Sequence, residues 1–294
     1  MTATLTPLAA LPRYTWTWRD YAITYTVQGT GDPLVLVHGF GASLGHWRHT
    51  IPVLAAAGYQ VWAVDLLGFG ASAKPVLDYS IELWVELLRD FQAALIQKPV
   101  VWIGNSIGGL ISLTLAAQHP ELTRGTILLN CAGGLSHRPK ELNPIFRLVM
   151  GTFTRLISTP GIGPFLFDRI RDPQRIRATL KQVYCRPEAI TDELVEILYR
   201  PSCDPNAAAV FAKIISAPAG IPPETLLPQV QSPLLVLWGD RDPWTPIQRG
   251  LSWQDYVRVP YRFIPLPNTG HCPHDERPEE VNPLILEWLQ TTLA

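Results

Sequence analysis

Five short runs of apolar residues alternate with segments of helical periodicity along most of this chain, and this alternation limits the folds open to it. The runs are continuous, so they predict strands buried on both faces of a parallel sheet. They cover residues 33–38, 60–66, 99–104, 125–129 and 233–238. The helical patterns cover residues 47–57, 81–97, 107–119 and 278–292. This order predicts an α/β fold with a doubly wound, mostly parallel sheet.

Two parts of the chain depart from this alternation. Residues 15–19 and 22–28 alternate apolar and polar side chains, which predicts an antiparallel hairpin. Residues 134–231 hold no run suited to a buried strand and are rich in proline, arginine and large apolar residues. Because this stretch separates two strands of one sheet, we expect an inserted helical cap there. The core would then comprise residues 1–133 and 232–294.

Composition excludes several classes of protein. The 294 residues include 24 basic and 25 acidic ones, a net charge of −1, which argues against a general nucleic-acid-binding protein. No stretch approaches the roughly 18 uncharged apolar residues of a transmembrane helix, and the first 13 residues lack the apolar core of a signal peptide. The four cysteines lack the spacing of a zinc site or a disulfide scaffold. A cytoplasmic protein is therefore expected.

The sequence Gly-Asn-Ser-Ile-Gly-Gly, residues 104–109, follows one predicted strand and opens a predicted helix. In this context G-x-S-x-G is the nucleophile-elbow pattern of serine hydrolases, in which a sharp turn lifts the serine hydroxyl above the sheet. We therefore predict Ser106 as a nucleophile. The backbone N–H of Ile107, at the N-terminus of the helix, is predicted to donate to an oxyanion. An ordinary glycine-rich turn is the alternative interpretation.

A second motif, His-Gly-Phe-Gly at residues 38–41, follows the first predicted parallel strand. Hydrolases with a nucleophile elbow take their other oxyanion donor from the loop at this point. The backbone N–H of Phe40 is therefore predicted to complete an oxyanion hole. A plain turn with a structural His38 is the alternative interpretation.

A serine nucleophile needs a base, and the base needs an acid to orient it. Both are expected after the serine in the chain. The sequence GDRDPW after the 233–238 run holds two carboxylates. Asp242 is favoured over Asp240, because it lies deeper in the loop, where its side chain can reach a histidine. Thr245 is then predicted to be the N-cap of the next helix and Pro246 its first residue.

The predicted base lies in the sequence PNTGHCPH, which follows a predicted strand near the C-terminus. His271 is favoured over His274. The latter, with Asp275 and Glu276, is predicted to hold the loop by hydrogen bonds. The two histidines do not indicate a metal site, because a third ligand and i, i+4 spacing on a helix are missing. No metal or organic cofactor is expected for this chemistry.

These motifs together resemble the α/β-hydrolase superfamily over nearly the whole chain. HGFG, DLLGFGAS, GNSIGG, WGDRDPW and GHCPHDERPEEVN occur in the order of that family. The resemblance implies that the acid is the last residue of G-x-x-D, Asp242, and that the base is the histidine of G-H, His271. Around these residues the sequence is also similar to pheophytinase and chlorophyll-dephytylase-like hydrolases of photosynthetic organisms. Those are serine hydrolases that cleave the phytyl ester of chlorophyll-type tetrapyrroles.

The sequence thus predicts an enzyme that cleaves a carboxylic ester, with a hydrophobic small molecule such as a long-chain or phytyl ester as substrate. A C–C bond hydrolase has a similar elbow and is the alternative chemistry. Epoxide hydrolases and dehalogenases would need an aspartate in place of Ser106. A non-catalytic small-molecule receptor on the same fold is the alternative from another class of protein.

The predicted cap is strongly basic. Residues 138–186 hold ten basic and three acidic side chains, a net charge of +7, which leaves −8 for the rest of the chain. Within it, residues 145–170 mix large apolar side chains with Arg147, Arg155 and Arg169. The plain interpretation is a helix pair that buries its apolar face. The alternative is an open apolar entrance whose basic rim contacts an anionic membrane peripherally.

Overall fold

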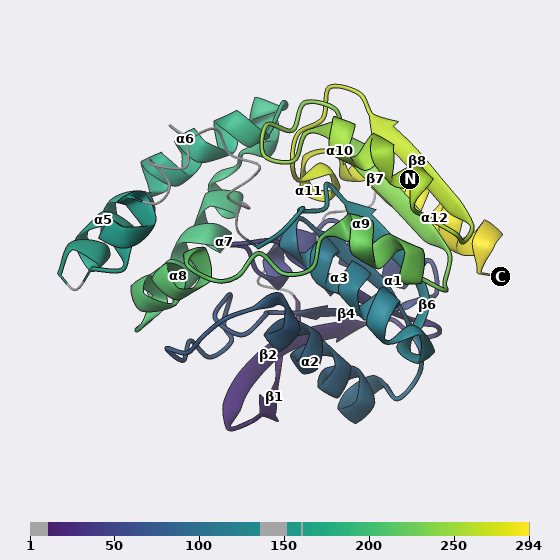
Figure 1. The fold of residues 1–294 in the computed structure, drawn as a ribbon, viewed down its shortest axis with the longest axis horizontal. Helices are drawn as coiled ribbons and strands as arrows, with labels where there is room; N and C mark the ends of the chain where they lie inside the picture. Colours follow the sequence, from purple (N-terminus) through teal and green to yellow (C-terminus); the bar gives the residue numbers. More distant parts are fainter. Residues whose placement is uncertain (1–10, 136–151, 160, 294) are drawn as a thin grey trace.

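The computed structural model describes residues 11–135, 152–159 and 161–293. It contains one eight-stranded sheet with the strand order β1-β2-β4-β3-β5-β6-β7-β8 (Figure 1). The strands are β1 Tyr14–Trp18, β2 Tyr21–Gln28, β3 Pro33–Val37, β4 Gln60–Val64, β5 Val100–Asn105, β6 Thr123–Leu129, β7 Leu234–Gly239 and β8 Tyr261–Leu266. β2 pairs antiparallel with β1 and β4, and all other neighbours are parallel. The predicted mostly parallel α/β fold is confirmed.

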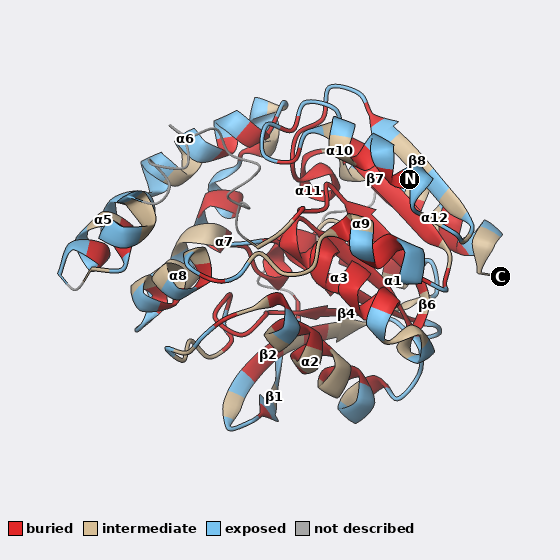
Figure 2. Cartoon of the chain, viewed as in Figure 1, coloured by how far each residue is buried: buried red, intermediate tan, exposed pale blue. Residues whose placement is uncertain are grey.

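The apolar runs form strands because helices cover both faces of the sheet. In β3, Leu34 and Leu36 belong to one buried cluster and Val35 and Val37 to the other, as alternation along a strand requires. The helices are α1 Ile51–Ala56 and α12 Pro278–Thr292 on the first face, and α2 Ile81–Phe91 and α3 Ile107–Gln118 on the second. Figure 2 shows the buried residues concentrated in the sheet and in α3.

Two predicted elements differ in extent. The helix predicted from residue 47 starts later, as α1, with Pro52 in its first turn, the one part of a helix that tolerates proline without losing a hydrogen bond. The helix predicted over residues 81–97 ends earlier, because α2 stops at Phe91 and a π-helical turn over Gln92–Ile96 follows it. The predicted hairpin is confirmed; its turn residues Arg19 and Asp20 both have positive φ, which matches the twist of a tight hairpin.

Between β6 and β7 the described chain is mainly helical, and we call this stretch the helical insertion. Residues 152–157 are helical, and the helices after them are α5 Ile162–Ile170, α6 Pro173–Val183, α7 Asp192–Ser202, α8 Ala207–Ile215 and the short α9 Pro223–Leu226. In Figure 1, α5 to α8 lie together beside the sheet, with α5 at the outer tip, whereas α9 returns to pack on α3. The division at residues 134 and 231 stays a prediction, and residues 136–151, including Arg147, lie outside the described residues. Within the described chain no helix is long and apolar enough to cross a membrane.

Candidate active site

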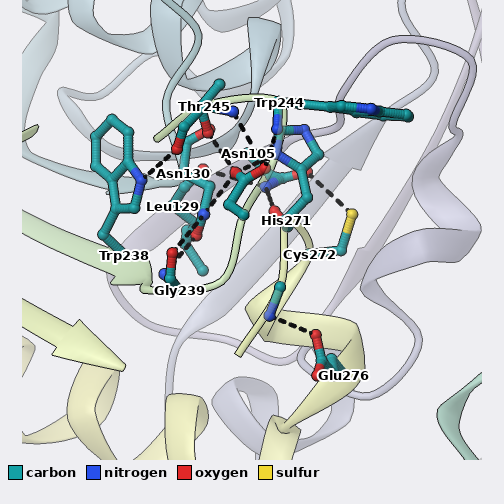
Figure 3. Close-up of polar contacts among 12 residues, drawn as sticks. Asn105, Leu129, Asn130, Trp238, Gly239, Trp244, Thr245, His271, Cys272 and Glu276 are labelled. Atoms are coloured by element: carbon teal, nitrogen blue, oxygen red, sulfur yellow. Dashed lines mark hydrogen bonds and ion pairs between the residues drawn. The ribbon is translucent and has the colours of Figure 1, made fainter. Parts of the chain in front are cut away.

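The residues predicted to carry the chemistry follow neighbouring strands. Ser106 comes directly after β5, Asp242 lies in the loop after β7, and His271 lies in the loop after β8. β5 to β8 are adjacent and parallel, so their carboxyl ends meet at one edge of the sheet. The structure therefore gathers side chains from several loops at this edge (Figure 3).

The turn at Ser106 has a strained backbone. Its φ of 56° and ψ of −122° lie where residues with a side chain are rarely found. A Cβ on Gly104 would lie 2.2 Å from the carbonyl oxygen of Gly108, and a Cβ on Gly108 would lie 2.2 Å from that of Val37. Only glycine fits at both positions. The glycines thus let α3 start immediately after β5, with Ser106 at the apex of the turn.

The loop at residues 38–41 lies against this turn, because a Cβ on Gly39 would be 3.2 Å from the Cβ of Ser106. His38 is fully buried, and its Nε2 accepts the N–H of Leu66 at 3.1 Å. Its Nδ1 therefore carries the proton and donates to the carbonyl of Gly39 at 2.8 Å. Burial lowers the pKa of His38, which keeps the ring neutral and structural. The oxyanion donors at Phe40 and Ile107 stay predictions.

A buried hydrogen bond joins the predicted acid and base. The Nδ1 of His271 lies 2.6 Å from Oδ2 of Asp242. Oδ1 of this carboxylate accepts the backbone N–H groups of Trp244 at 2.8 Å and Thr245 at 3.1 Å. Oδ2 also accepts the Asn130 side chain at 2.7 Å and the Thr245 hydroxyl. Burial alone raises the pKa of Asp242, but the hydrogen bonds from His271 and Thr245 outweigh it and bring that pKa below its ordinary value.

The competing carboxylate has other neighbours. Asp240 lies at the exit of β7, and its side chain lies 3.8 Å from the guanidinium of Arg241. The prediction that Thr245 caps the next helix is wrong. That helix, α10 Ile247–Leu251, begins after Pro246, and Thr245 directs both its N–H and its hydroxyl to Asp242. A buried carboxylate requires these donors more than a helix of five residues requires a cap.

Two asparagines of the site were not predicted from the sequence. Asn130 follows β6, and besides contacting Asp242 it accepts the N–H of Gly239 at 2.9 Å. Asn105 ends β5, and its amide donates to the carbonyls of Leu129 at 3.1 Å and His271 at 3.0 Å. Each asparagine lies at the end of an apolar run. A polar residue at the carboxyl end of a predicted parallel strand is the signal that could have identified both as site residues.

Comparison with known proteins agrees with this geometry. The chain matches the alpha/beta hydrolase family over residues 34–284. It belongs to that family. It is 30% identical to the chloroplastic pheophytinase of Arabidopsis thaliana over 88% of this chain, and it spans 61% of that protein's length. It is also 30% identical to the 2-hydroxy-6-oxo-6-(2'-aminophenyl)hexa-2,4-dienoic acid hydrolase of Metapseudomonas resinovorans, over 90% of this chain and 86% of that protein.

Solved structures of hydrolases have the same fold. A membrane phospholipase A described as a bacterial virulence factor is 28% identical, with a TM-score of 0.78 over 97% of this chain and 87% of that one. A serine hydrolase involved in carbazole degradation is 25% identical, with a TM-score of 0.75 over 96% of this chain and 99% of that one. The chain is thus an enzyme of the α/β-hydrolase family, whose similar members differ in the bond they cleave.

The loop that carries His271 in this α/β hydrolase ends in α11 Pro273–Glu276, and one prediction about it is wrong. Asp275 and Glu276 do hold the loop by hydrogen bonds. His274 does not: within the described chain neither of its ring nitrogens has a hydrogen-bond partner. Its ring packs on Trp47, with centroids 4.0 Å apart. Its contribution is the packing of its ring against Trp47 and, edge-to-face, against His46. No pattern in the sequence indicates the distant tryptophan.

A group of histidines beside the site is held neutral. His46 is fully buried, and burial together with the charge of Arg48 lowers its pKa to about 3. The same two causes lower the pKa of His49, and burial, then His46 and Arg48, lower that of His274 well below its usual range. The Nε2–H of His46 donates to the phenol oxygen of Tyr184 at 2.9 Å, because the hydroxyl of Tyr184 itself donates to Asp275.

We expect these histidines to make the fold sensitive to acid. Each has a lower pKa in the folded chain than in the unfolded chain, so the unfolded chain binds protons that the folded chain rejects. The stability they contribute above about pH 6.5 is therefore lost as the pH falls. His274→Phe should flatten the decline of unfolding free energy below that pH by up to about 1.4 kcal/mol per pH unit.

Urea titrations between pH 7 and pH 4.5 measure this slope. His119→Gln, which removes a histidine outside this group, is measured beside it as the control. An unchanged slope in His274→Phe would show that its ring takes up a proton in the folded state.

Proposed function

We propose that this protein is a serine hydrolase that cleaves a carboxylic ester. The observation that carries the proposal is the 2.6 Å hydrogen bond between His271 and Asp242, at the same sheet edge as the strained turn of Ser106. The carboxylate accepts the Nδ1 proton, so the Nε2 of His271 is left as the free acceptor of the imidazole. This is the tautomer that a base acting on a serine hydroxyl needs.

In the proposed reaction Ser106 attacks the ester carbonyl while His271 takes its proton. The backbone N–H groups of Phe40 and Ile107 bind the oxyanion, and one such donor is typically worth about 2.7–4 kcal/mol of barrier. His271 then protonates the leaving alcohol, and Asp242 stabilises the imidazolium. Water then attacks the acyl group on Ser106 while His271 takes a proton from it. His271 returns this proton to the oxygen of Ser106 as the carboxylic acid leaves.

Aromatic side chains near these residues support a hydrophobic substrate. Phe40 is 39% exposed and contacts Phe69 and, from α8 of the helical insertion, Phe211. Trp244 is 51% exposed, and its ring lies edge-to-face with that of His271 at 5.1 Å. Large apolar rings left open to solvent beside a reactive group favour an apolar ligand. We propose a long-chain or phytyl ester, and the similarity to a pheophytinase supports that choice.

Cleavage of a C–C bond by the same three residues is the second candidate. It is supported by the 30% identity to a hydrolase named for a dienoic acid substrate. Epoxide hydrolysis is not proposed, although a protein named epoxide hydrolase 3 is 27% identical, because position 106 is a serine rather than the aspartate that such a reaction needs.

We expect Ser106→Ala and His271→Ala each to lower kcat by about 10⁴–10⁶-fold without unfolding the protein. Asp242→Asn should lower it by about 10⁴-fold, because an amide favours the wrong tautomer of the imidazole. Asp240→Asn is the matched control and should stay near wild type. Ester hydrolysis and fluorophosphonate labelling of Ser106 measure these effects. If Asp240→Asn were the more damaging change, the acid would be assigned wrongly, and an inert wild-type Ser106 would favour a receptor.

A substrate panel separates the two chemistries. It comprises short and long p-nitrophenyl esters, phytyl esters of tetrapyrroles and a dienol C–C substrate, each assayed with Ser106→Ala as background. We expect kcat/KM to rise with the length of the apolar part of the ester. A higher kcat/KM on the C–C substrate than on every ester would replace the proposed ester cleavage by C–C cleavage.

We further propose that the tip of the helical insertion, at α5, contacts anionic membranes. The protein would then be cytoplasmic and would bind these membranes peripherally. Phe165 of α5 is 58% exposed. Ile162 and Ile170 of the same helix are exposed as well, and so is Leu156, which precedes that helix in the chain. The guanidinium of Arg169 lies 5.1 Å from the centre of the Phe165 ring. Apolar side chains flanked by arginine suit the interface of an acidic bilayer.

Co-sedimentation with anionic and neutral liposomes tests this contact. We expect binding to anionic vesicles that weakens at high salt, and Phe165→Asp should abolish it. Leu251→Asp alters a similarly exposed leucine on α10 and should bind like wild type. Phe165→Asp should also reduce turnover of long-chain esters and spare short ones. Absence of binding in every condition would remove the membrane proposal, and an equal loss on both esters would show that Phe165 has no selective role in the turnover of long-chain esters.

A further inference from the structure

The backbone of His271 lies against the end of α6 in the helical insertion. The N–H of His271 donates to the carbonyl of Val183 at 2.8 Å. Gly270 also lies against this carbonyl and leaves no room for a side chain, since a Cβ there would be 1.9 Å from the oxygen. The position of the predicted base therefore depends on where this end of α6 lies.

One carboxylate fastens the two segments together. Oε2 of Glu276 accepts the N–H of Gly270, the residue before His271, at 2.8 Å. Oε1 of the same carboxylate accepts the N–H groups of Cys185 at 2.9 Å and Arg186 at 3.1 Å. Glu276 is buried, so these three backbone donors replace the water that its charge would otherwise bind. Figure 3 shows Glu276 directed toward the chain beside His271.

The preceding residue makes a parallel connection. Oδ2 of Asp275 accepts the hydroxyl of Tyr184 at 2.8 Å, and Oδ1 accepts the guanidinium of Arg48. Arg48 follows the 3₁₀ turn Leu44–Trp47, which comes after the 38–41 loop. Two consecutive carboxylates thus tie the His271 loop to the helical insertion, and one of them also reaches the segment after the predicted oxyanion loop.

We propose that Glu276 is a positioning residue for catalysis, which fixes the backbone of His271 by fastening its loop to residues 185 and 186 of the insertion, with Asp275 and Tyr184 as the supporting pair. This inference rests on the proposed function, in which His271 is the base. Glu276 acts through main-chain atoms, because the ring of His271 has Asp242 as its partner. A small displacement of a reacting group is enough to lower a rate strongly.

Glu276→Gln tests the proposal. Glutamine keeps the size of the side chain, but its NH₂ group must face either the N–H of Gly270 or those of Cys185 and Arg186, so one side of the connection is lost. We expect kcat for a short p-nitrophenyl ester to fall at least about tenfold while KM changes less than about twofold. Active sites are counted by fluorophosphonate titration, so a loss of folded protein alone would leave the kcat per site unchanged.

Glu279→Gln is the matched control. Glu279 pairs with the guanidinium of the same Arg186 at the exposed surface, but the structure describes no hydrogen bond or ion pair between Glu279 and Gly270. It should retain wild-type kcat per site. Equal kcat values for wild type and Glu276→Gln, or an equal loss in Glu279→Gln, would overturn the proposal.

If Glu276→Gln yields no folded protein, Tyr184→Phe carries the test, because it removes the hydroxyl that Asp275 accepts and keeps the ring. A lower kcat per site at unchanged KM supports the proposal, and an unchanged kcat overturns it. Failure of the proposed function is recognised separately, since Ser106→Ala would then retain the ester turnover of wild type.

Discussion

The site depends on the backbone of Ser106 staying in a conformation that it would not adopt alone. A non-glycine residue held at such φ and ψ values costs on the order of 1–3 kcal/mol. The surrounding chain determines it: the N–H of Ser106 donates to Leu129, and its carbonyl accepts the N–H groups of Ala132 at 3.0 Å and Leu110 at 3.2 Å. α3 is buried from Ile107 onward almost to its end. The packed β5–α3 unit therefore supplies the free energy that keeps the turn in place.

Features that are encoded locally could be predicted from the sequence. The elbow lies in six consecutive residues between a strand and a helix, and Asp242 and His271 each lie in the loop that follows a strand, so parallel pairing alone brings these loops to one edge. Features made by distant parts of the chain could not be predicted. Asn130 and Asp242 are 112 residues apart and Arg48 and Asp275 are 227 apart, and no pattern near either residue indicates its partner.

The electrostatic arrangement of the site follows from which groups are left charged. Besides His271, the donors that the structure describes on Asp242 are backbone N–H groups, an amide and a hydroxyl, all neutral. They stabilise the carboxylate without a fixed cation to cancel its charge. Its field is therefore directed at His271, where a positive charge develops when the imidazole takes a proton. The buried histidines nearby, being neutral, do not oppose that charge.

The helical insertion positions part of the candidate site as well as covering the strand ends. If it only covered the substrate, its contacts with the core would be side-chain packing that tolerates shifts. Instead its carbonyl at Val183 accepts the N–H of His271 itself, and its N–H groups at Cys185 and Arg186 donate to the carboxylate of Glu276 in the same loop. Hydrogen bonds between main-chain and carboxylate groups hold distances within a few tenths of an ångström. The helical insertion is thus joined by several hydrogen bonds to the loop that carries the predicted base, His271.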